Sequence, residues 1–151
     1  MRKPVIAAVA LVALATTAVA LGAATGESYS YKATLTAKQE TPKPKAPAKA
    51  GGTFTAKVIE NGAKRTLKWK LTFHNLSGKA VGAHIHQGKP GVSGPVIVPL
   101  CGACKSGASG TMTITTAAAD ALEHGKAYVN VHTGKNLPGE IRGAVKLVMH
   151  G

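Results

Sequence analysis

The sequence is poor in aromatic residues, acidic residues and cysteine, and these shortages remove whole classes of function. Aromatic side chains make up only 4% of the chain, too few for the stacking platforms of single-stranded nucleic-acid binders. The 6 acidic residues give no obvious pair of carboxylates for acid–base hydrolysis. The sequence also lacks a Gly-x-Ser-x-Gly motif, a His-Glu-x-x-His motif and a phosphate-binding loop, so we expect no hydrolase.

Basic residues, by contrast, are in excess, and the formal net charge is +13. Without a recognition helix, nucleic acid is not an expected partner. Outside a cell, such charge favours an anionic cell-wall polymer, an acidic glycan or a lipid headgroup, and a basic surface that only keeps the protein soluble is the alternative. The lysines stand singly along predicted strands, at Lys32, Lys57, Lys68, Lys70 and Lys146.

The first 26 residues differ in composition from the rest. Two basic residues precede an apolar run from Val5 to Leu21, and small residues follow it. This order is typical of a secretory signal peptide, here residues 1–26. An uncleaved anchor helix is the alternative, although the run is short for a membrane span of about 20 residues. We therefore predict a secreted or wall-associated protein, with residues 27–151 as its single domain and no stable membrane insertion after cleavage.

From Tyr29 onward, apolar and polar residues alternate with the period of two that half-buried strands show. Turn residues separate seven or eight such stretches. This spacing predicts an all-β fold, an antiparallel Greek-key β-sandwich or barrel. One short helix is predicted over residues 116–123, with Thr115 or Thr116 as its N-cap and Gly125 beyond its end.

A turn followed by one strand is predicted near the C-terminal end of the sequence. A turn is predicted at residues 136–139, because it contains proline and glycine. One strand is then predicted from Glu140 to Met149. On this strand Ile141, Leu147 and Met149 share a face.

Three histidines are the feature that indicates chemistry. His84 and His86 lie in one predicted strand and His132 lies in another. If Val81 and Ile85 face the core, all three imidazoles lie on the outer face, because alternate residues of a strand share a face. Neutral imidazole is a good ligand for Cu(II) or Zn(II), and three imidazoles leave one coordination position open. The alternative is that His84 and His86 only hydrogen-bond turn backbone or Glu140, and that His132 caps a loop.

Three polar residues are candidates to surround these histidines. We predict that Asn130 and Glu140 orient the free ring nitrogens. Glu140 and Arg142 also share a face, and a partly exposed ion pair between them would contribute about 0–1 kcal/mol. Binding of an anion is the alternative role for Arg142.

Cys101 and Cys104 are the only cysteines, and they form a Cys-x-x-Cys motif. In an exported β-protein this motif predicts a disulfide that closes a glycine-rich loop. Zinc binding is the alternative, but the chain has no second pair of cysteines to complete such a site.

Several motifs occur in a fixed order along the chain: Gln39-Glu-Thr-Pro42, Ala83-His-Ile-His-Gln-Gly88, Gly91-Val-Ser-Gly-Pro-Val-Ile-Val-Pro-Leu100, Tyr128-Val-Asn-Val-His-Thr133 and Gly139-Glu-Ile-Arg-Gly143. Together they resemble the CHRD domain, a module named for its repeats in chordin that also occurs as a single exported domain in bacteria. The resemblance covers about residues 29–148. It implies an extracellular all-β domain and does not imply an activity.

A second resemblance concerns chemistry. A His-x-His strand, a later strand ending in histidine and an arginine on the last strand are similar in order to the copper side of copper/zinc superoxide dismutases. This resemblance implies copper, ahead of zinc, at His84, His86 and His132, with Arg142 in the place of an anion-guiding arginine. The chain departs from the pattern because it lacks the long loop that carries the bridging histidine and the zinc ligands.

These observations lead to two hypotheses. The first is a secreted, non-enzymatic CHRD binding module that engages a metal ion, an anionic wall polymer or an extracellular protein. The second is a copper-dependent redox enzyme similar to superoxide dismutase.

Overall fold

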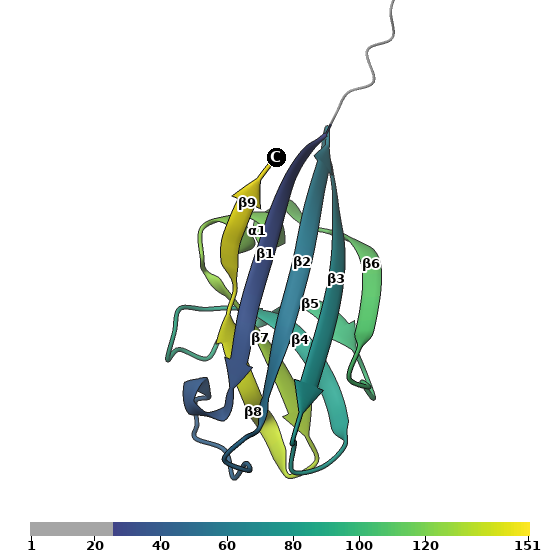
Figure 1. Ribbon diagram of the computed structural model, residues 1–151. Helices are drawn as coiled ribbons and strands as arrows, with labels where there is room; N and C mark the ends of the chain where they lie inside the picture. Colours follow the sequence, from purple (N-terminus) through teal and green to yellow (C-terminus); the bar gives the residue numbers. More distant parts are fainter. Residues whose placement is uncertain (1–25) are drawn as a thin grey trace, which may run out of the picture.

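The computed structural model describes residues 26–151, so the predicted signal peptide lies outside the described residues apart from Gly26. The described chain is built almost entirely of strands (Figure 1). In chain order the elements are β1 (Glu27–Thr36), a 3-10 turn η1 (Ala37–Gln39), β2 (Gly51–Asn61), β3 (Lys64–His74), β4 (Ala80–Gln87), β5 (Val96–Cys101), β6 (Ala108–Ile114), α1 (Thr116–Glu123), β7 (Ala127–Thr133), β8 (Asn136–Ala144) and β9 (Lys146–His150).

The strands pair antiparallel in the order β5-β4-β7-β8-β1-β2-β3-β6, and β9 lies beside β1. β8 and β1 meet only at Thr36 and Arg142, so the sheet folds there into two layers. In Figure 1, β1, β2 and β3 lie in front of β4 and β7. The chain crosses between the layers from β3 to β4 and from β6 to β7, and β3 neighbours β6 while β4 neighbours β7. This interleaving confirms the predicted all-β Greek-key sandwich or barrel.

The core follows from the alternation of apolar residues. Leu67, Trp69 and Leu71 of β3 are buried, and they pack in one cluster with Phe54 of β2 and Ile85 of β4. Each large apolar side chain that leaves water contributes about 1.5–3 kcal/mol. The residues between them point outward and are mostly lysine and threonine.

The predicted α-helix forms at Thr116–Glu123, as expected. The Thr115 hydroxyl accepts a hydrogen bond from the backbone N–H of Ala118 at 3.1 Å, which caps the first turn. Gly125, just beyond the end, has a φ of +64°, a conformation that glycine adopts without strain. No helix of residues 26–151 is long and apolar enough to cross a membrane.

One expectation about the histidine strand is wrong. Val81 is 48% exposed instead of facing the core. The pairing of β4 with β7 shifts its register between Ala80 and Gly82, and this irregularity turns Val81 outward. From Gly82 onward the alternation holds, and Ile85 is fully buried.

The end of the chain also differs from expectation. The turn lies at Gly134 and Lys135, so the predicted turn residues 136–139 belong to β8. The predicted last strand is two strands, β8 and β9, separated at Val145. β9 is not a continuation of β8 along the core; it is a separate strand that pairs with β1. Leu147 and Met149 on β9 are therefore 42% and 65% exposed.

Candidate metal centre

The three predicted histidines converge on one patch of the β4–β7 layer. β4 and β7 are neighbouring antiparallel strands, with His84 opposite Asn130 and Gly82 opposite His132. Alternate residues share a face, so His84, His86 and His132 all point away from the core. Gly82 has no side chain, and a Cβ built there would lie 3.4 Å from the His84 ring.

The ring nitrogens are close enough to share one ion. One ligand atom from each of the three histidines can be chosen so that all lie within 4.8 Å of one another. His84 Nδ1 and His132 Nε2 are already 3.1 Å apart. A tetrahedral ion with bonds of about 2.0–2.1 Å needs nitrogen pairs separated by about 3.4 Å. Small ring rotations therefore suffice to gather the three donors.

Backbone carbonyls fix the tautomers of two rings. His86 Nδ1 donates to Gly94 O, and His132 Nδ1 donates to Leu137 O, each at 2.8 Å. A carbonyl oxygen only accepts, so both Nδ1 atoms carry the proton and both Nε2 atoms keep a lone pair. This is the tautomer that a metal ligand requires, and its second nitrogen is held as in known metal sites.

His84 occupies a different position in the hydrogen-bond network. Because His132 Nε2 is an acceptor, His84 Nδ1 donates the 3.1 Å hydrogen bond between them. A metal ion at His132 Nε2 would take the lone pair that this bond uses. His84 would then be free to change tautomer or rotate and to offer a nitrogen of its own.

Burial favours the neutral form of His84 and His86. The three side chains are half-buried, and burial lowers the pKa of His84, helped by the neighbouring His132 and His86 rings. Burial also lowers the pKa of His86, against the effect of its hydrogen bond to Gly94. His86 Nε2 is buried and has no hydrogen-bond partner within the described chain. Neutral imidazole is the form that binds metal ions.

Tyr128 and Arg142 form a stack against the His86 ring. The Tyr128 ring stacks on His86 with centroids 4.9 Å apart, and the Arg142 guanidinium lies 3.4 Å from the centre of the Tyr128 ring. Arg142 Nη2 donates to the carbonyls of Lys89 and Val92 at 2.8 and 2.7 Å. Arg142 is 2% exposed, so it holds the loop 88–95 in place and does not face solvent as an anion-guiding residue would.

Asn130 does not orient a histidine, contrary to expectation. Its side-chain amide donates to Pro138 O at 3.3 Å and to Glu40 Oε2 at 3.5 Å. Sequence reasoning missed Glu40 as a buried residue, although it lies in one of the ordered motifs. Burial raises the pKa of Glu40 to about 7, against the opposing charge of Arg142.

Glu140 also has a role other than the predicted one. It is fully buried and forms no ion pair with Arg142; the ion pair found in the described chain joins Arg65 to Glu60. Its carboxylate accepts hydrogen bonds from Ser77, Thr133 and Asn136. Burial alone would raise its pKa, but these hydrogen bonds lower it. Glu140 is therefore a structural anchor away from the histidines.

The cysteine prediction is confirmed. Cys101 and Cys104 form a disulfide with their Cα atoms 5.6 Å apart. The bond closes the loop between β5 and β6 and leaves no thiolate in the described residues for a metal.

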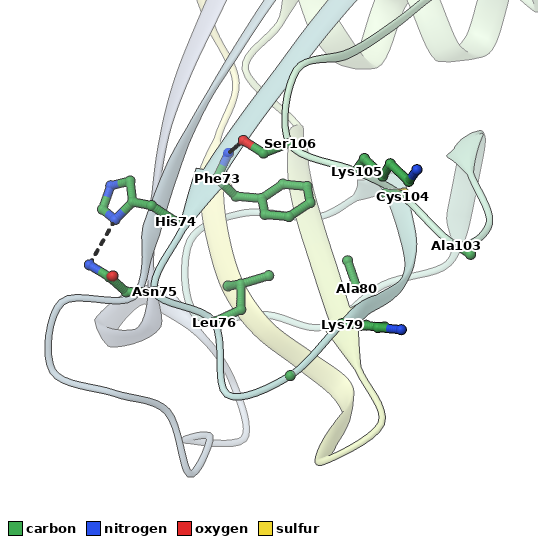
Figure 2. A pocket seen from close by; sticks show the side chains of 11 residues that line it. Phe73, His74, Asn75, Leu76, Lys79, Ala80, Ala103, Cys104, Lys105 and Ser106 are labelled. Carbon is green, nitrogen blue, oxygen red and sulfur yellow. Dashed lines mark hydrogen bonds between the residues drawn. The ribbon is translucent and has the colours of Figure 1, made fainter.

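A hollow of about 620 Å³ lies elsewhere, between the end of β3 and the disulfide loop, and the three histidines do not line it. Figure 2 shows Phe73, Leu76 and Ala80 around it, with His74 directed away and bonded to Asn75. The hollow is mainly apolar and has no cluster of metal donors.

Comparison with known proteins places the chain in a family. No curated protein and no solved structure matches the sequence. The model of the CHRD domain family matches residues 31–145, which include the histidines, the loop 88–95 and the disulfide. Because this match covers well over half of the sequence, the chain belongs to the CHRD domain family.

Proposed function

We propose that this CHRD domain is a non-enzymatic binding module that holds one copper ion through His84, His86 and His132. Membership of the family supports a binding module, and CHRD domains are typically extracellular. The donors would be Nε2 of His86, Nε2 of His132 and one nitrogen of His84. The predicted export of the chain would bring the site into contact with extracellular copper.

The observation that carries this proposal is the unpartnered Nε2 of His86. This acceptor is buried beside two other imidazoles, and nothing in the described chain donates to it. A buried acceptor without a partner costs about 1–3 kcal/mol. A metal ion bound at this nitrogen would remove that cost, and the carbonyl of Gly94 already fixes the required tautomer.

The donor set favours copper over other ions. The cluster contains three imidazoles without a carboxylate or a thiolate, since both cysteines are in the disulfide. Such a site is poor for Mg²⁺ and Ca²⁺, which prefer oxygen ligands. Among the first-row divalent ions that imidazole binds, Cu²⁺ generally forms the strongest complexes, ahead of Zn²⁺.

A copper-dependent redox enzyme is the second candidate. It is favoured by the number of donors, because three imidazoles leave a coordination position open for a small substrate. Against it, Arg142 lies buried under Tyr128 and is bonded to backbone carbonyls. Superoxide turnover by the copper-loaded protein would favour this second candidate over the binding module.

The test is a titration of the metal-free protein with Cu(II) and Zn(II), followed by calorimetry and electron paramagnetic resonance. We expect one Cu(II) per chain, a spectrum with nitrogen hyperfine structure, and weaker binding of Zn(II). His86→Ala and His132→Ala should each lower the copper affinity at least about tenfold, because each removes one of three ligands.

His74→Ala is the matched control, since it removes an exposed imidazole that lies outside the cluster. Its copper affinity should equal that of the wild type. If His74→Ala weakens binding as much as His86→Ala does, copper binds to scattered surface histidines and the proposal is wrong. Thermal unfolding of each metal-free variant checks that lost binding does not reflect lost folding.

A further inference from the structure

The fold brings five lysines that are spread singly through the sequence together on one surface. Four of them alternate with core residues along their strands, and the fifth, Lys146, pairs in register with Lys32, so all five point out of the sandwich. We call this surface the lysine face. It is the outer face of β9, β1, β2 and β3, at the front in Figure 1. The lysines that define it are Lys32, Lys57, Lys68, Lys70 and Lys146.

Two pairs of these lysines stand directly opposite each other on neighbouring strands. Lys57 of β2 pairs in register with Lys68 of β3, and Lys32 of β1 pairs with Lys146 of β9. Directly opposed residues have Cβ atoms about 4.5–5.5 Å apart, and like charges at that distance destabilise a sheet. The two opposed pairs therefore lower the stability of the sheet, so their presence calls for a role other than stabilising the fold.

No acidic residue of the described chain offsets this charge. All five lysines are exposed, and none is in an ion pair; the ion pair found in residues 26–151 joins Arg65 to Glu60. The other outward positions at the same level, such as Ser30 and Thr55, carry hydroxyl groups. An unpaired concentration of one charge is suited to a partner of the opposite charge.

The shape of the surface narrows the choice of partner. Two shallow hollows of about 440 and 290 Å³ lie on it, and both are lined by Lys32 and Val148. The aromatic side chains beneath the lysines, Tyr31, Phe54 and Trp69, are buried in the core. Tyr29 and Phe73 are partly buried and take inward-facing positions of their strands. The lysine face thus offers no exposed ring on which a sugar or a nucleic-acid base could stack.

The type and spacing of the charges also matter. Lysine acts as a compact point charge, and this surface lacks arginine, whose planar fork pairs with a carboxylate or a phosphate through two hydrogen bonds at once. The backbones of opposed lysines are one strand spacing apart, about 4.8 Å, and Lys68 and Lys70 are two residues apart along one strand, about 6.7 Å. Such a pattern is suited to a flexible chain with a negative charge on each repeat.

We propose that the lysine face binds a linear polyanion whose charges are phosphodiester groups. The polymer would lie across β9, β1, β2 and β3, with its phosphates between opposed lysines, where they relieve the repulsion. This site is independent of the histidine cluster, because the two lie on the outer faces of opposite layers of the sandwich.

The test uses lipid-free poly(glycerol phosphate) as the probe and measures its affinity for the protein by calorimetry at several salt concentrations. The variants are Lys57→Gln/Lys68→Gln and Lys32→Gln/Lys146→Gln. Each should weaken binding about tenfold or more and lower the steepness of log K against log salt by about 1 per lost contact. Each should also raise the unfolding midpoint or leave it unchanged, because a repulsive pair is removed.

The matched control is Lys105→Gln/Lys126→Gln, which removes two exposed lysines elsewhere on the surface. It should retain the wild-type affinity, and copper binding should be unchanged in all three double variants. Equal weakening in the control would show that only the net charge matters. Equal or tighter binding to polygalacturonate, or to phosphatidylglycerol vesicles, would show a carboxylate polymer or a membrane surface as the partner. Any of these results overturns the proposal.

Discussion

Glu40 is a carboxyl group that the fold removes from water without pairing both of its oxygens. Its Oε1 atom and the Oδ1 atom of Asn130 are buried and have no hydrogen-bond partner in the described chain. Both oxygens lie beside Gly139, where a Cβ would collide with them. Burial raises the pKa of Glu40 to about 7, so near neutral pH its carboxyl group can carry a proton and donate it to the Oδ1 atom of Asn130.

This raised pKa predicts a pH-dependent stability. The folded protein holds the Glu40 proton up to about pH 7, whereas the unfolded chain releases it near pH 4.5. Glu40 therefore favours folding below about pH 4.5, and this contribution is lost as the pH rises to about 7. Glu40→Gln, which stays neutral, should be more stable than the wild type at pH 8 by on the order of 2–3 kcal/mol. Urea unfolding of both proteins at pH 5 and pH 8 measures the difference.

The quantity to compare is the difference in unfolding free energy between variant and wild type. The histidines also titrate in this pH range, but they are present in both proteins and cancel in this difference. Glu123→Gln replaces an exposed carboxyl group on α1 and serves as the control. Its stability should follow that of the wild type at both pH values. A gap for Glu40→Gln that does not widen from pH 5 to pH 8 would mean that Glu40 is ionised throughout.

At this scale the sequence predicts the candidate ligands but not their surroundings. The period of two and the order of the strands are enough to expect His84, His86 and His132 on one face. The groups that orient two of the rings are the backbone carbonyls of Gly94 and Leu137. Carbonyls occur at every residue, so no pattern of side chains marks them in advance.

The loop 88–95 is the element that completes the histidine cluster. It provides the Gly94 carbonyl to His86, and it is fastened by Arg142 through the carbonyls of Lys89 and Val92. The backbone N–H of Gly94 also donates to the Tyr128 hydroxyl at 3.1 Å. Arg142 is thus a positioning residue that acts on His86 through the loop.

Arg142→Lys tests this role. Lysine keeps the charge but has a shorter side chain and no planar group to stack on Tyr128, so the loop should loosen. We expect copper affinity to fall by about 10- to 100-fold, the usual effect of losing support behind a ligand. The Nδ1 proton of His86, seen by nuclear magnetic resonance, should exchange faster with water while that of His132 does not change.

Tyr128→Phe provides a milder comparison. It keeps the ring between His86 and Arg142 and removes only the acceptor for Gly94. The copper affinity should fall less than in Arg142→Lys. If both variants bind copper as the wild type does while the His86 proton exchanges faster, the loop does not support the ligand.

The strands themselves were largely predictable, and the failures share a cause. Alternation locates a strand and assigns its two faces, which succeeds for β2, β3 and β7. It does not indicate which strand lies beside which, so the shift that exposes Val81 and the break at Val145 were missed. Leu147 and Met149 continue the alternation of β8 but lie on β9, where a register shift against β1 breaks the alternation and both side chains are exposed.

At the scale of the whole molecule, Glu140 joins connections that are far apart in the sequence. Its carboxylate accepts from Ser77 in the β3–β4 connection and from Thr133 and Asn136 at the β7–β8 turn. Asn136 in turn bonds the backbone of Lys45 in the proline-rich loop between β1 and β2. One buried charge therefore ties together three connections at one end of the sandwich.

Such a network could not be predicted from the spacing of residues. Glu140 and Arg142 are two residues apart, and the sequence favours an ion pair between them. In the fold they contact different loops, Arg142 the segment 88–95 and Glu140 the segment around Ser77. The hydrogen-bond partners of Glu140 and Arg142 depend on how the two layers pack against each other. The local sequence pattern does not predict that packing.

Glu140→Gln tests whether the charge, and not only the shape, holds this end together. The amide offers hydrogen-bond donors where the surrounding groups are also donors, so the variant should lose about 2–4 kcal/mol of unfolding free energy at pH 7. Hydrogen bonds lower the pKa of Glu140, so its contribution is present above about pH 4.5, where the unfolded chain is ionised, and is lost as the pH falls through the folded pKa. Urea unfolding should therefore show that the difference in unfolding free energy between variant and wild type shrinks below pH 4.5.

Glu60→Gln, at a surface ion pair, is the control and should cost only about 0–1 kcal/mol. A Glu140→Gln gap that stays constant from pH 7 to pH 3 would mean that the three connections are held without the carboxylate charge.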